Sequence, residues 1–340
     1  MKQNSLSKTA KVIFIVVGVL FAVFFSVRTY NSYRFHLEKQ TRVMMDTYVT
    51  VYAVGPEKLT SKAVNAALQR MEEVDEKFDF LNPKSPLYAF NNEGAPISDS
   101  EIVDLVKLAL GVSRDSDGAF DITICPLISL WGFYGDHPSV PDHESIERCI
   151  EKIGYKHLVV RNSKVEKTRP DIRIDLGGIA KGYAVGEAIK VLRAEGVTSA
   201  LIDAGGDVYA MGKKGLRSWK VGIKDPRGDG LLGFIEAEDL SIMGSGDYER
   251  FFMDQGKRYH HIFNPKTGYP ASGLTGTTIL YGDPALADAW NTALFVLGPE
   301  KGLEIVESIP GMEVIMVTES GEVLYSSGLK DRLQAISTIE

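Results

Sequence analysis

The sequence predicts an α+β fold in which mixed sheets pack against helices. Helical and two-residue apolar periodicities follow one another without the regular strand–helix–strand alternation of a doubly wound fold. A chain of 340 residues can bury a sizeable core, as a single large domain or as two intimate halves. An apolar segment near the N-terminus stands apart from this pattern, so we expect the domain to lie behind a membrane anchor.

The anchor is predicted from charge and hydropathy. Lys2, Lys8 and Lys11 precede an uncharged apolar run, which is typical of a signal peptide or a signal anchor. The run ends without a small-x-small cleavage site and is not amphipathic as a buried core helix would be, which favours an uncleaved anchor. The lysines then stay in the cytoplasm, and the domain lies on the periplasmic side of the inner membrane. The expected segments are a cytoplasmic tail (1–11), the anchor (12–27), a linker (28–40) and the domain (41–340).

Apolar spacing predicts the elements of the domain. Residues 61–77, 102–112 and 144–153 carry apolar side chains at helical spacing. A loop rich in Pro, Asn and aromatic residues is expected at 78–91, and its Phe80 would either stack on a ligand ring or pin the loop to the core. Strands are expected at 48–54, 157–161, 171–175, 199–203, 219–223, 276–281 and 312–317.

Composition excludes several classes of function. The chain has 45 acidic and 38 basic residues and a formal net charge of −7, which argues against nucleic acid as a partner. Two cysteines, Cys125 and Cys149, are too few for a disulfide framework or a metal cage. Cys125 precedes a proline in an apolar stretch, so we expect it to be a small buried hydrophobe.

A carboxylate and a hydroxyl stand four residues apart in an apolar stretch near the C-terminus. Asp288 and Thr292 would project from one face of a helix. Because burying a bare charge is costly, Asp288 needs a partner, and Mg²⁺ prefers oxygen ligands and leaves positions open for phosphate. The alternative is that Asp288 caps the helix and Thr292 back-bonds to a carbonyl, which explains the pair better when it is taken alone.

A second polar segment joins a predicted strand to a predicted helix. Ile172 and Ile174 alternate with polar residues up to Asp175, a glycine pair follows, and alanines then recur at helical spacing. Such a glycine turn lets the backbone approach a ligand, and a helix N-terminus presents free N–H groups to an anion. Lys181 lies in the first turn, where its charge opposes the helix dipole, so its position suits a phosphate or a carbonyl oxygen. The alternative is an ordinary turn with a solvated lysine.

Further segments combine glycine with polar residues. Each of them alone is explained by plain turn chemistry. They are 117–123, which leads into 126–133, then 203–207, 245–248 and 260–268.

Together these segments resemble the ApbE-type flavin transferases, which are FAD:protein FMN transferases. The resemblance covers roughly residues 41–330, in the family's order and at its spacing, and its most specific segments are 175–183, 261–268 and 288–298. One departure is visible, because Asp46 stands where the family usually has glycine between Met45 and Thr47. We expect this change to affect the local backbone or adenine contacts, and not the phosphate or metal chemistry.

The resemblance implies a substrate, a metal and a reaction. FAD would bind as substrate with Mg²⁺ on its phosphates, and a threonine hydroxyl of an acceptor redox protein in or at the membrane would attack the FMN-side phosphorus. FMN would become linked to the threonine through a phosphoester, and AMP would leave. The implied FAD contacts are Met45, Phe80, Ala119, Phe120, Asp121, Asp175, Lys181 and Phe263, and the implied metal contacts are Asp288, Asn291, Thr292 and the carbonyl of Gly178.

The implied general base is His261, whose ordinary pKa suits proton transfer near neutral pH. On a regular strand His260 would face the opposite side, so one of the two histidines can point into the site. A lone histidine beside a turn is more often structural, and the resemblance is what favours a catalytic role. Asp247 is an alternative proton acceptor.

Two other functions stay open. Water could replace threonine, which would make the chain a Mg²⁺-dependent FAD pyrophosphatase that yields FMN and AMP. The chain could also be a non-catalytic FAD-binding protein. The pair of Asp288 and Thr292 counts against simple storage, because storage needs no metal on a leaving group.

Overall fold

An antiparallel sheet forms the centre of the molecule. The computed structural model describes residues 16–26, 36–330, 332 and 334–335. The largest sheet has eight strands in the order β1-β2-β5-β6-β9-β12-β13-β14, and each neighbouring pair is antiparallel. The strands are β1 (His36–Met44), β2 (Thr47–Gly55), β5 (Ala200–Ala204), β6 (Asp207–Met211), β9 (Leu240–Gly246), β12 (Leu274–Tyr281), β13 (Glu313–Thr318) and β14 (Val323–Tyr325).

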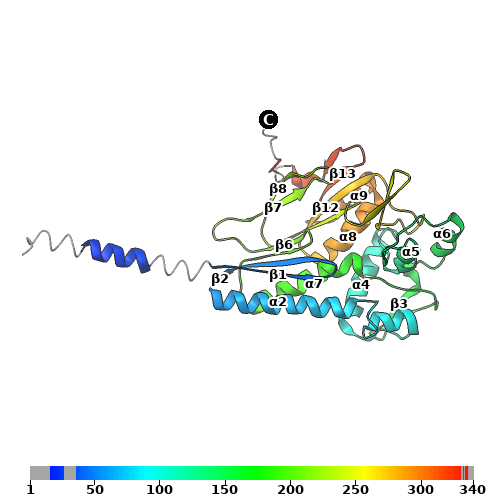
Figure 1. Cartoon of the computed structure of the whole chain (residues 1–340), viewed down its shortest axis with the longest axis horizontal. Helices are drawn as coiled ribbons and strands as arrows, with labels where there is room; N and C mark the ends of the chain where they lie inside the picture. The colour runs from blue at the N-terminus through cyan, green and yellow to red at the C-terminus, as the bar shows by residue number, and fades with distance from the viewer. Residues whose placement is uncertain (1–15, 27–35, 331, 333, 336–340) are drawn as a thin grey trace, which may run out of the picture.

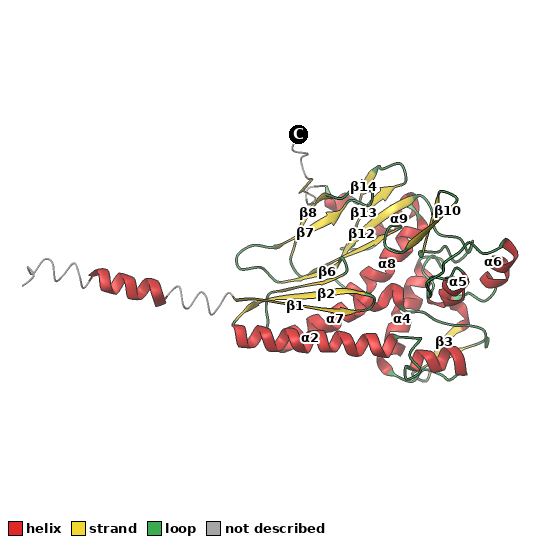
Figure 2. Cartoon of the chain, in the orientation of Figure 1, coloured by secondary structure: helices red, strands yellow, loops and turns green. Residues whose placement is uncertain are grey.

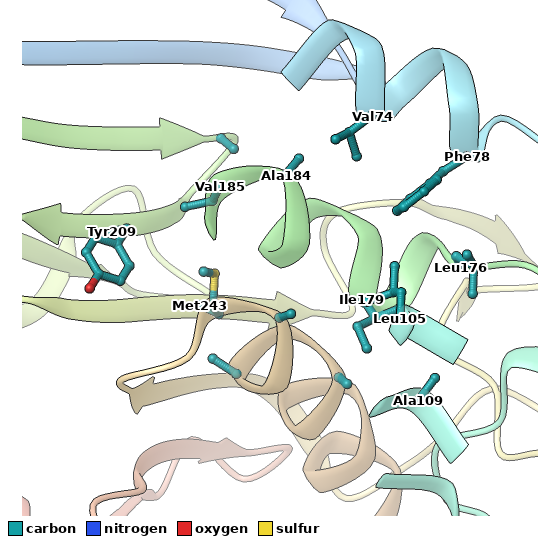
Figure 3. Close-up of a cluster of buried hydrophobic side chains, with 14 of the residues drawn as sticks. Val74, Phe78, Leu105, Ala109, Leu176, Ile179, Ala184, Val185, Tyr209 and Met243 are labelled. Carbon is teal, nitrogen blue, oxygen red and sulfur yellow. The ribbon is translucent and has the colours of Figure 1, made fainter. Parts of the chain in front are cut away.

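Long helices cover one face of this sheet, as Figures 1 and 2 show. Helix α7 (Gly177–Ala194) packs between α2 (Glu57–Phe78) and α8 (Pro284–Leu297), and α4 (Ser100–Asp115) packs against α8. Their apolar faces bury one continuous core against the sheet, which is the main source of stability for amphipathic helices. Part of this core is drawn in Figure 3, where the labelled side chains are Val74, Phe78, Leu105, Ala109, Leu176, Ile179, Ala184, Val185, Tyr209 and Met243.

A smaller sheet covers the opposite face. Strands β7 (Trp219–Lys224), β8 (Leu231–Ala237) and β15 (Gln334–Ala335) pair antiparallel to each other. Side chains of β7 alternate between buried and exposed, so one face of this sheet is apolar. Its buried residues form a second core with buried side chains of β6, β9 and β12.

An aromatic cluster lies beside the sheet, around the fully buried Trp131. Trp131 follows α5 (Cys125–Leu130), and its ring centroid is 5.4 Å from that of Phe263 and 5.5 Å from that of Tyr259. Helix α6 (His143–Ile150) and the hairpin of β10 (Phe251–Asp254) and β11 (Lys257–His260) contribute to the same cluster. The remaining elements are α3 (Pro86–Tyr88), a π-helix (Ala89–Glu93), the 3₁₀-helices Ile122–Ile124, Tyr155–His157 and Ser327–Leu329, β3 (Leu158–Arg161), β4 (Lys164–Lys167) and α9 (Pro299–Ser308).

The mixed α+β architecture and most predicted elements are confirmed. The predicted helices correspond to α2, α4 and α6, and the predicted strands to β2, β3, β5, β7, β12 and β13. The strand predicted at 171–175 is wrong, because that described segment is not part of a sheet; Ile172 and Ile174 alternate only because both are buried in the main core. The loop predicted at 78–91 contains α3 and the start of the π-helix.

The N-terminal region differs in part from the expectation. Strand β1 begins at His36, so residues 36–40 belong to the sheet and not to a linker. Residues 16–26 are helical and expose large apolar side chains. Within the described ranges, no helix has the length and hydropathy that crossing a bilayer requires. The expected anchor at 12–27 extends past this helix on both sides, and residues 12–15 and 27 lie outside the described residues.

Candidate active site

A cavity of about 670 Å³ opens where several elements end near the N-terminus of α7. This volume lies within the range of about 300–1,000 Å³ that is typical of small-molecule sites. The β1–β2 turn, the C-terminal end of α2, the glycine turn after β5 and the end of β9 all contribute to its wall. Helix α8 closes it with Asp288 and Thr292.

The cavity brings together almost every predicted site residue. These residues come from elements that are far apart in the chain, so their convergence is a property of the fold. Asn291 is not among the described residues that line the cavity. Those that line it are Met45, Phe80, Ala119, Phe120, Asp121, Asp175, Gly178, Lys181, His261, Phe263, Asp288 and Thr292.

The side chain of Asn291 faces the sheet. Its Nδ2 donates to the carbonyl of Met243 at 3.0 Å and to Ser245 Oγ at 2.9 Å, and its Oδ1 accepts from Thr277 Oγ1 at 2.7 Å. These bonds tie α8 to β9 and β12. The amide of Asn291 therefore positions the helix that carries Asp288 and Thr292, and it does not reach the cavity itself.

Asp288 is a buried carboxylate with a raised pKa. It is 6% exposed, and its Oδ2 accepts the backbone N–H of Gly182 at 2.9 Å. The capping explanation is wrong, because the N-cap of α8 is Asp283, whose carboxylate accepts from the N–H of Leu286. Burial, and after it the nearby charge of Asp207, raise the pKa of Asp288 to about 7. The anionic form of this carboxylate is therefore under-compensated by the protein alone.

Glycines bring the start of α7 into close contact with α8. A Cβ on Gly182 would lie 2.1 Å from the carbonyl oxygen of Pro284 and 2.7 Å from Asp288 Cβ. A Cβ on Gly178 would lie 3.0 Å from the Phe120 ring and 3.6 Å from Thr292 Oγ1. Gly177 and Gly178 are the first residues of the helix, so the predicted glycine turn is wrong, and these glycines serve close approach instead.

The same contact affects the carbonyl of Gly178. In a regular α-helix the N–H of Gly182 would donate to that carbonyl. Because the N–H also meets Asp288 Oδ2 at 2.9 Å, the two oxygens compete for one donor. The carboxylate of Asp288, the hydroxyl of Thr292 and the carbonyl of Gly178 thus offer oxygen atoms that could coordinate a metal ion at one point of the cavity.

Lys181 forms an ion pair at the cavity wall. Its Nζ lies 2.5 Å from Oδ2 of Asp207, and the other oxygen of Asp207 accepts the N–H of Gly244 at 2.9 Å. The charge of Asp207, and to a lesser degree that of Asp288, raises the pKa of Lys181 against the effect of burial. The alternative of a solvated lysine in a plain turn is therefore wrong.

Asp175 lies at the base of the cavity in a closed network. Its carboxylate accepts hydrogen bonds from the Tyr134 hydroxyl and, at 2.7 Å, from the N–H of Gly177. Burial raises the pKa of Asp175, while these two bonds act in the opposite direction. Cys125 is buried beside them, as expected, and desolvation raises the pKa of its thiol to about 12. The thiol is consequently a packing group at neutral pH.

Two further predicted FAD contacts, Asp121 and Phe80, have structural partners of their own. The Asp121 carboxylate is buried and accepts from the N–H and hydroxyl of Thr123 and from the N–H of Tyr155, so it caps a 3₁₀-helix. Phe80 packs edge-on against Tyr134, with ring centroids 4.9 Å apart, and also lines the cavity. Both explanations weighed for Phe80, namely packing and a ligand-facing ring, are compatible with this position.

The side chains of His260 and His261 point to different surroundings, as expected, and His261 is the one that lines the cavity. His260 is 5% exposed, and its Nε2 lies 2.9 Å from the carbonyl of Ala271. His261 lines the cavity, and its Nδ1 lies 3.2 Å from the carbonyl of Arg250. A carbonyl can only accept, so Nδ1 carries the proton and Nε2 keeps its lone pair. Desolvation lowers the pKa of His261 to about 3, which keeps the ring neutral at physiological pH.

Asp247 is unsuited to accept a proton from substrate. Its Oδ1 accepts from Arg227 at 2.7 Å and from Arg258 at 3.1 Å, and its Oδ2 accepts from Arg227 at 2.6 Å. Two guanidinium groups therefore occupy both oxygens of this carboxylate. Asp247 is also absent from the described residues that line the cavity.

The structure adds residues that the sequence did not single out. Tyr134, Asp207 and Arg250 each contact a predicted site residue, from another element or another part of the chain. Asp207 was part of a glycine-rich segment but had no assigned partner. Contacts over such separations have no periodic pattern in a sequence, so only the fold reveals them.

Comparison with known proteins places this geometry in context. The model of the ApbE family matches residues 45–316. The chain is 31% identical to an FAD:protein FMN transferase of Klebsiella pneumoniae over 82% of its own length and 83% of that protein, and 30% identical to one of Treponema pallidum over 85% and 86%. Among solved structures it resembles the ApbE protein of Thermotoga maritima, with a TM-score of 0.82, 34% identity and coverage of 87% and 98%. The apo flavinyl transferase ApbE of Pseudomonas stutzeri gives a TM-score of 0.79, 30% identity and coverage of 89% and 98%.

Proposed function

The chain belongs to the ApbE family, and from this premise we propose that it transfers FMN from FAD to a threonine hydroxyl of an acceptor protein, with Mg²⁺, and releases AMP. The observation that carries the proposal is that Asp288, Thr292, Gly178 and His261 all line one cavity. A buried acid and a hydroxyl suit a hard cation that can bind phosphate, a helix N-terminus suits the phosphate itself, and a neutral imidazole suits an alcohol nucleophile. The relatives' names supply FAD as the donor of FMN.

The oxygen donors at α7 and α8 fit Mg²⁺. Asp288 provides a buried carboxylate whose pKa of about 7 shows that its charge lacks compensation. The hydroxyl of Thr292 and the carbonyl of Gly178 would complete the protein's share of a hard-cation site. When bound, the ion would offset negative charge on the pyrophosphate as AMP departs.

His261 is placed to handle the proton of the nucleophile. With Nδ1–H donated to the Arg250 carbonyl, Nε2 can accept the hydroxyl proton of threonine. The threonine oxygen then bonds to the FMN-side phosphorus, and the bond from that phosphorus to the bridging oxygen breaks, so AMP carries the electron pair away.

The location of the reaction is a further part of the proposal, and it is inferred from the N-terminal segment. We propose that residues 12–27 anchor the chain in the inner membrane, with residues 41–340 on the periplasmic side and a redox protein in or at the membrane as acceptor. The three lysines before an uncharged apolar run support this topology. Fractionation of cells tests it: the full chain should sediment with membranes, and recovery of the intact chain in the cytosolic fraction would contradict the anchor.

Incubation with FAD, Mg²⁺ and a threonine-bearing acceptor tests the activity itself. The proposal predicts flavin covalently attached to the acceptor and one AMP per flavin transferred. Equal production of free FMN and AMP with an unmodified acceptor would instead identify a pyrophosphatase. FAD that stays bound and intact in the presence of Mg²⁺ would identify a storage protein.

A further inference from the structure

We propose that Arg250 is a phosphate-binding residue of the FAD site and that Asp46 holds it by an ion pair until FAD displaces the carboxylate. The inference deepens the proposed function and rests on FAD being the substrate. It departs from the sequence-based expectation that Asp46 leaves the phosphate chemistry unaffected. Arg250 Nη2 lies 2.8 Å from Asp46 Oδ2, and both residues line the cavity. They are 204 positions apart in the chain, so the pair links the β1–β2 turn to the segment just before β10 across the cavity wall.

The charge inventory of the cavity shows why Arg250 matters. Among the described residues that line it, the cationic side chains are Lys181 and Arg250. Lys181 is already paired with Asp207 at 2.5 Å. The acidic lining residues outnumber these cations; they are Asp46, Asp75, Asp79, Asp121, Asp175, Glu249 and Asp288. A pyrophosphate that enters such a cavity needs a cation whose present partner is easily replaced.

The ion pair of Asp46 and Arg250 meets that requirement. The Asp46 side chain is 80% exposed and that of Arg250 is 50% exposed, so solvent screens their attraction. By contrast, Asp207 is 2% exposed and holds Lys181 in a buried pair. A guanidinium binds phosphate oxygens bidentately, with stronger hydrogen bonds than one exposed carboxylate offers. Exchange of Asp46 for a phosphate is therefore favoured at Arg250 and not at Lys181.

The backbone around both residues can tolerate this exchange. The carbonyl of Arg250 accepts the N–H of His261 at 3.1 Å and also faces its Nδ1, so the backbone of Arg250 is fixed, while its side chain is half-exposed. Met45 and Asp46 have φ values of 51° and 56°, as the two central residues of a tight hairpin turn require. Aspartate and asparagine tolerate this left-handed conformation, so Asp46→Asn removes the charge without disturbing the turn.

A double-mutant cycle on FAD binding tests the proposal, with the full chain in chelator so that no turnover occurs. Arg250→Ala should weaken FAD binding by about tenfold, because one charge-assisted contact is lost. Asp46→Asn should tighten FAD binding by a few-fold, since the competing carboxylate is gone. In the Arg250→Ala background, Asp46→Asn should have no further effect. Riboflavin, which lacks phosphate, should bind all four proteins equally.

Asp79→Asn is the matched control, because it removes one carboxylate from the cavity lining without touching the ion pair. Its effect on FAD affinity should be the same with and without Arg250. Equal effects of Asp46→Asn in both backgrounds, or equal losses of riboflavin and FAD binding in Arg250→Ala, would overturn this proposal alone. Failure of the wild-type chain to bind FAD at all would overturn the proposed function as well.

Discussion

The ammonium group of Lys181 lies 2.5 Å from the carboxylate of Asp207, a residue that is only 2% exposed. The lysine therefore has two tasks: it neutralises a buried acid on β6, and it faces the cavity beside Asp288. This relationship explains how a lysine can occupy the first turns of a helix, where the dipole disfavours it. It also means that a change at Lys181 affects the fold and the ligand site together.

Replacement of Lys181 should show both effects. Lys181→Met should lower the free energy of unfolding by about 1–3 kcal/mol, because it leaves Asp207 buried without its partner. The loss is smaller than for a fully buried ion pair, because the side chain of Lys181 is a third exposed and solvent screens the interaction. The double variant Lys181→Met/Asp207→Asn should recover stability in thermal melts but not FAD affinity. If the double variant regains FAD binding as well, Lys181 contributes to the fold and not to the ligand.

Binding of Mg²⁺ should depend on pH through Asp288. Its pKa is raised to about 7, so the carboxyl is protonated below that pH, and a proton then competes with the metal. The apparent affinity for Mg²⁺ should fall by about tenfold per pH unit below pH 7 and level off above it. Calorimetric titration between pH 5.5 and about 8.5 measures this dependence.

Variants on the same helix separate the metal site from helix capping. Asp288→Asn should abolish tight Mg²⁺ binding at every pH and leave the fold intact. Asp283→Asn keeps an equally good cap, so it should bind Mg²⁺ like the wild-type chain. A Mg²⁺ affinity that stays constant through pH 6–8 would argue against Asp288 as the ligand.

Close contact between α7 and α8 should make Gly182 intolerant of a side chain. Gly182→Ala places a Cβ 2.1 Å from Pro284 O, so the helices must separate. We expect a loss of about 1–3 kcal/mol in stability together with weaker Mg²⁺ binding, because Asp288 moves with α8. Gly111→Ala on α4 meets nothing within 4 Å and should be neutral or stabilising in the same melts.

His261 should act on rate and not on binding. His261→Ala should keep FAD and Mg²⁺ affinity and lose about 10²–10⁴-fold in transfer rate. Because its pKa is lowered to about 3, the ring is neutral at any pH where the enzyme is assayed, so the limb of the pH–rate profile near pH 7 should come from Asp288 and persist in the variant. Loss of that limb in His261→Ala would reassign it to the histidine.

Sequence patterns predicted the elements that have strong periodicity. The apolar positions of α2 and α4 followed directly from three- and four-residue spacing. Strand β1 was missed, because its sequence is mostly polar and every inward residue before Met44 is only half-buried. The strand at 171–175 was predicted wrongly. Ile172 and Ile174 are buried and their neighbours are not, which gives the alternating pattern of a strand although the segment pairs with no sheet.

The residues of the site were also predicted only in part. The family resemblance identified the residues that line the cavity, whereas their partners came from the fold alone. Nothing in the segment around Lys181 identifies Asp207 as its counter-ion, 26 positions later, and nothing near Asp46 indicates Arg250. Asn291 shows the converse, since Asp288 and Thr292 on the same helix line the cavity while helical geometry turns its amide toward β9.

The most direct test of the central claim is intact-protein mass spectrometry of a threonine-bearing acceptor after incubation with this chain, FAD and Mg²⁺. The acceptor should gain one FMN less one water, peptide mapping should place the flavin on a threonine, and AMP should be released in equal amount. Asp288→Ala should abolish the gain, and an acceptor with that threonine changed to alanine should stay unmodified. An unmodified acceptor alongside complete conversion of FAD to FMN and AMP would show that the chain is not a transferase, and full flavin attachment by Asp288→Ala would show that Asp288 is not required for the transfer.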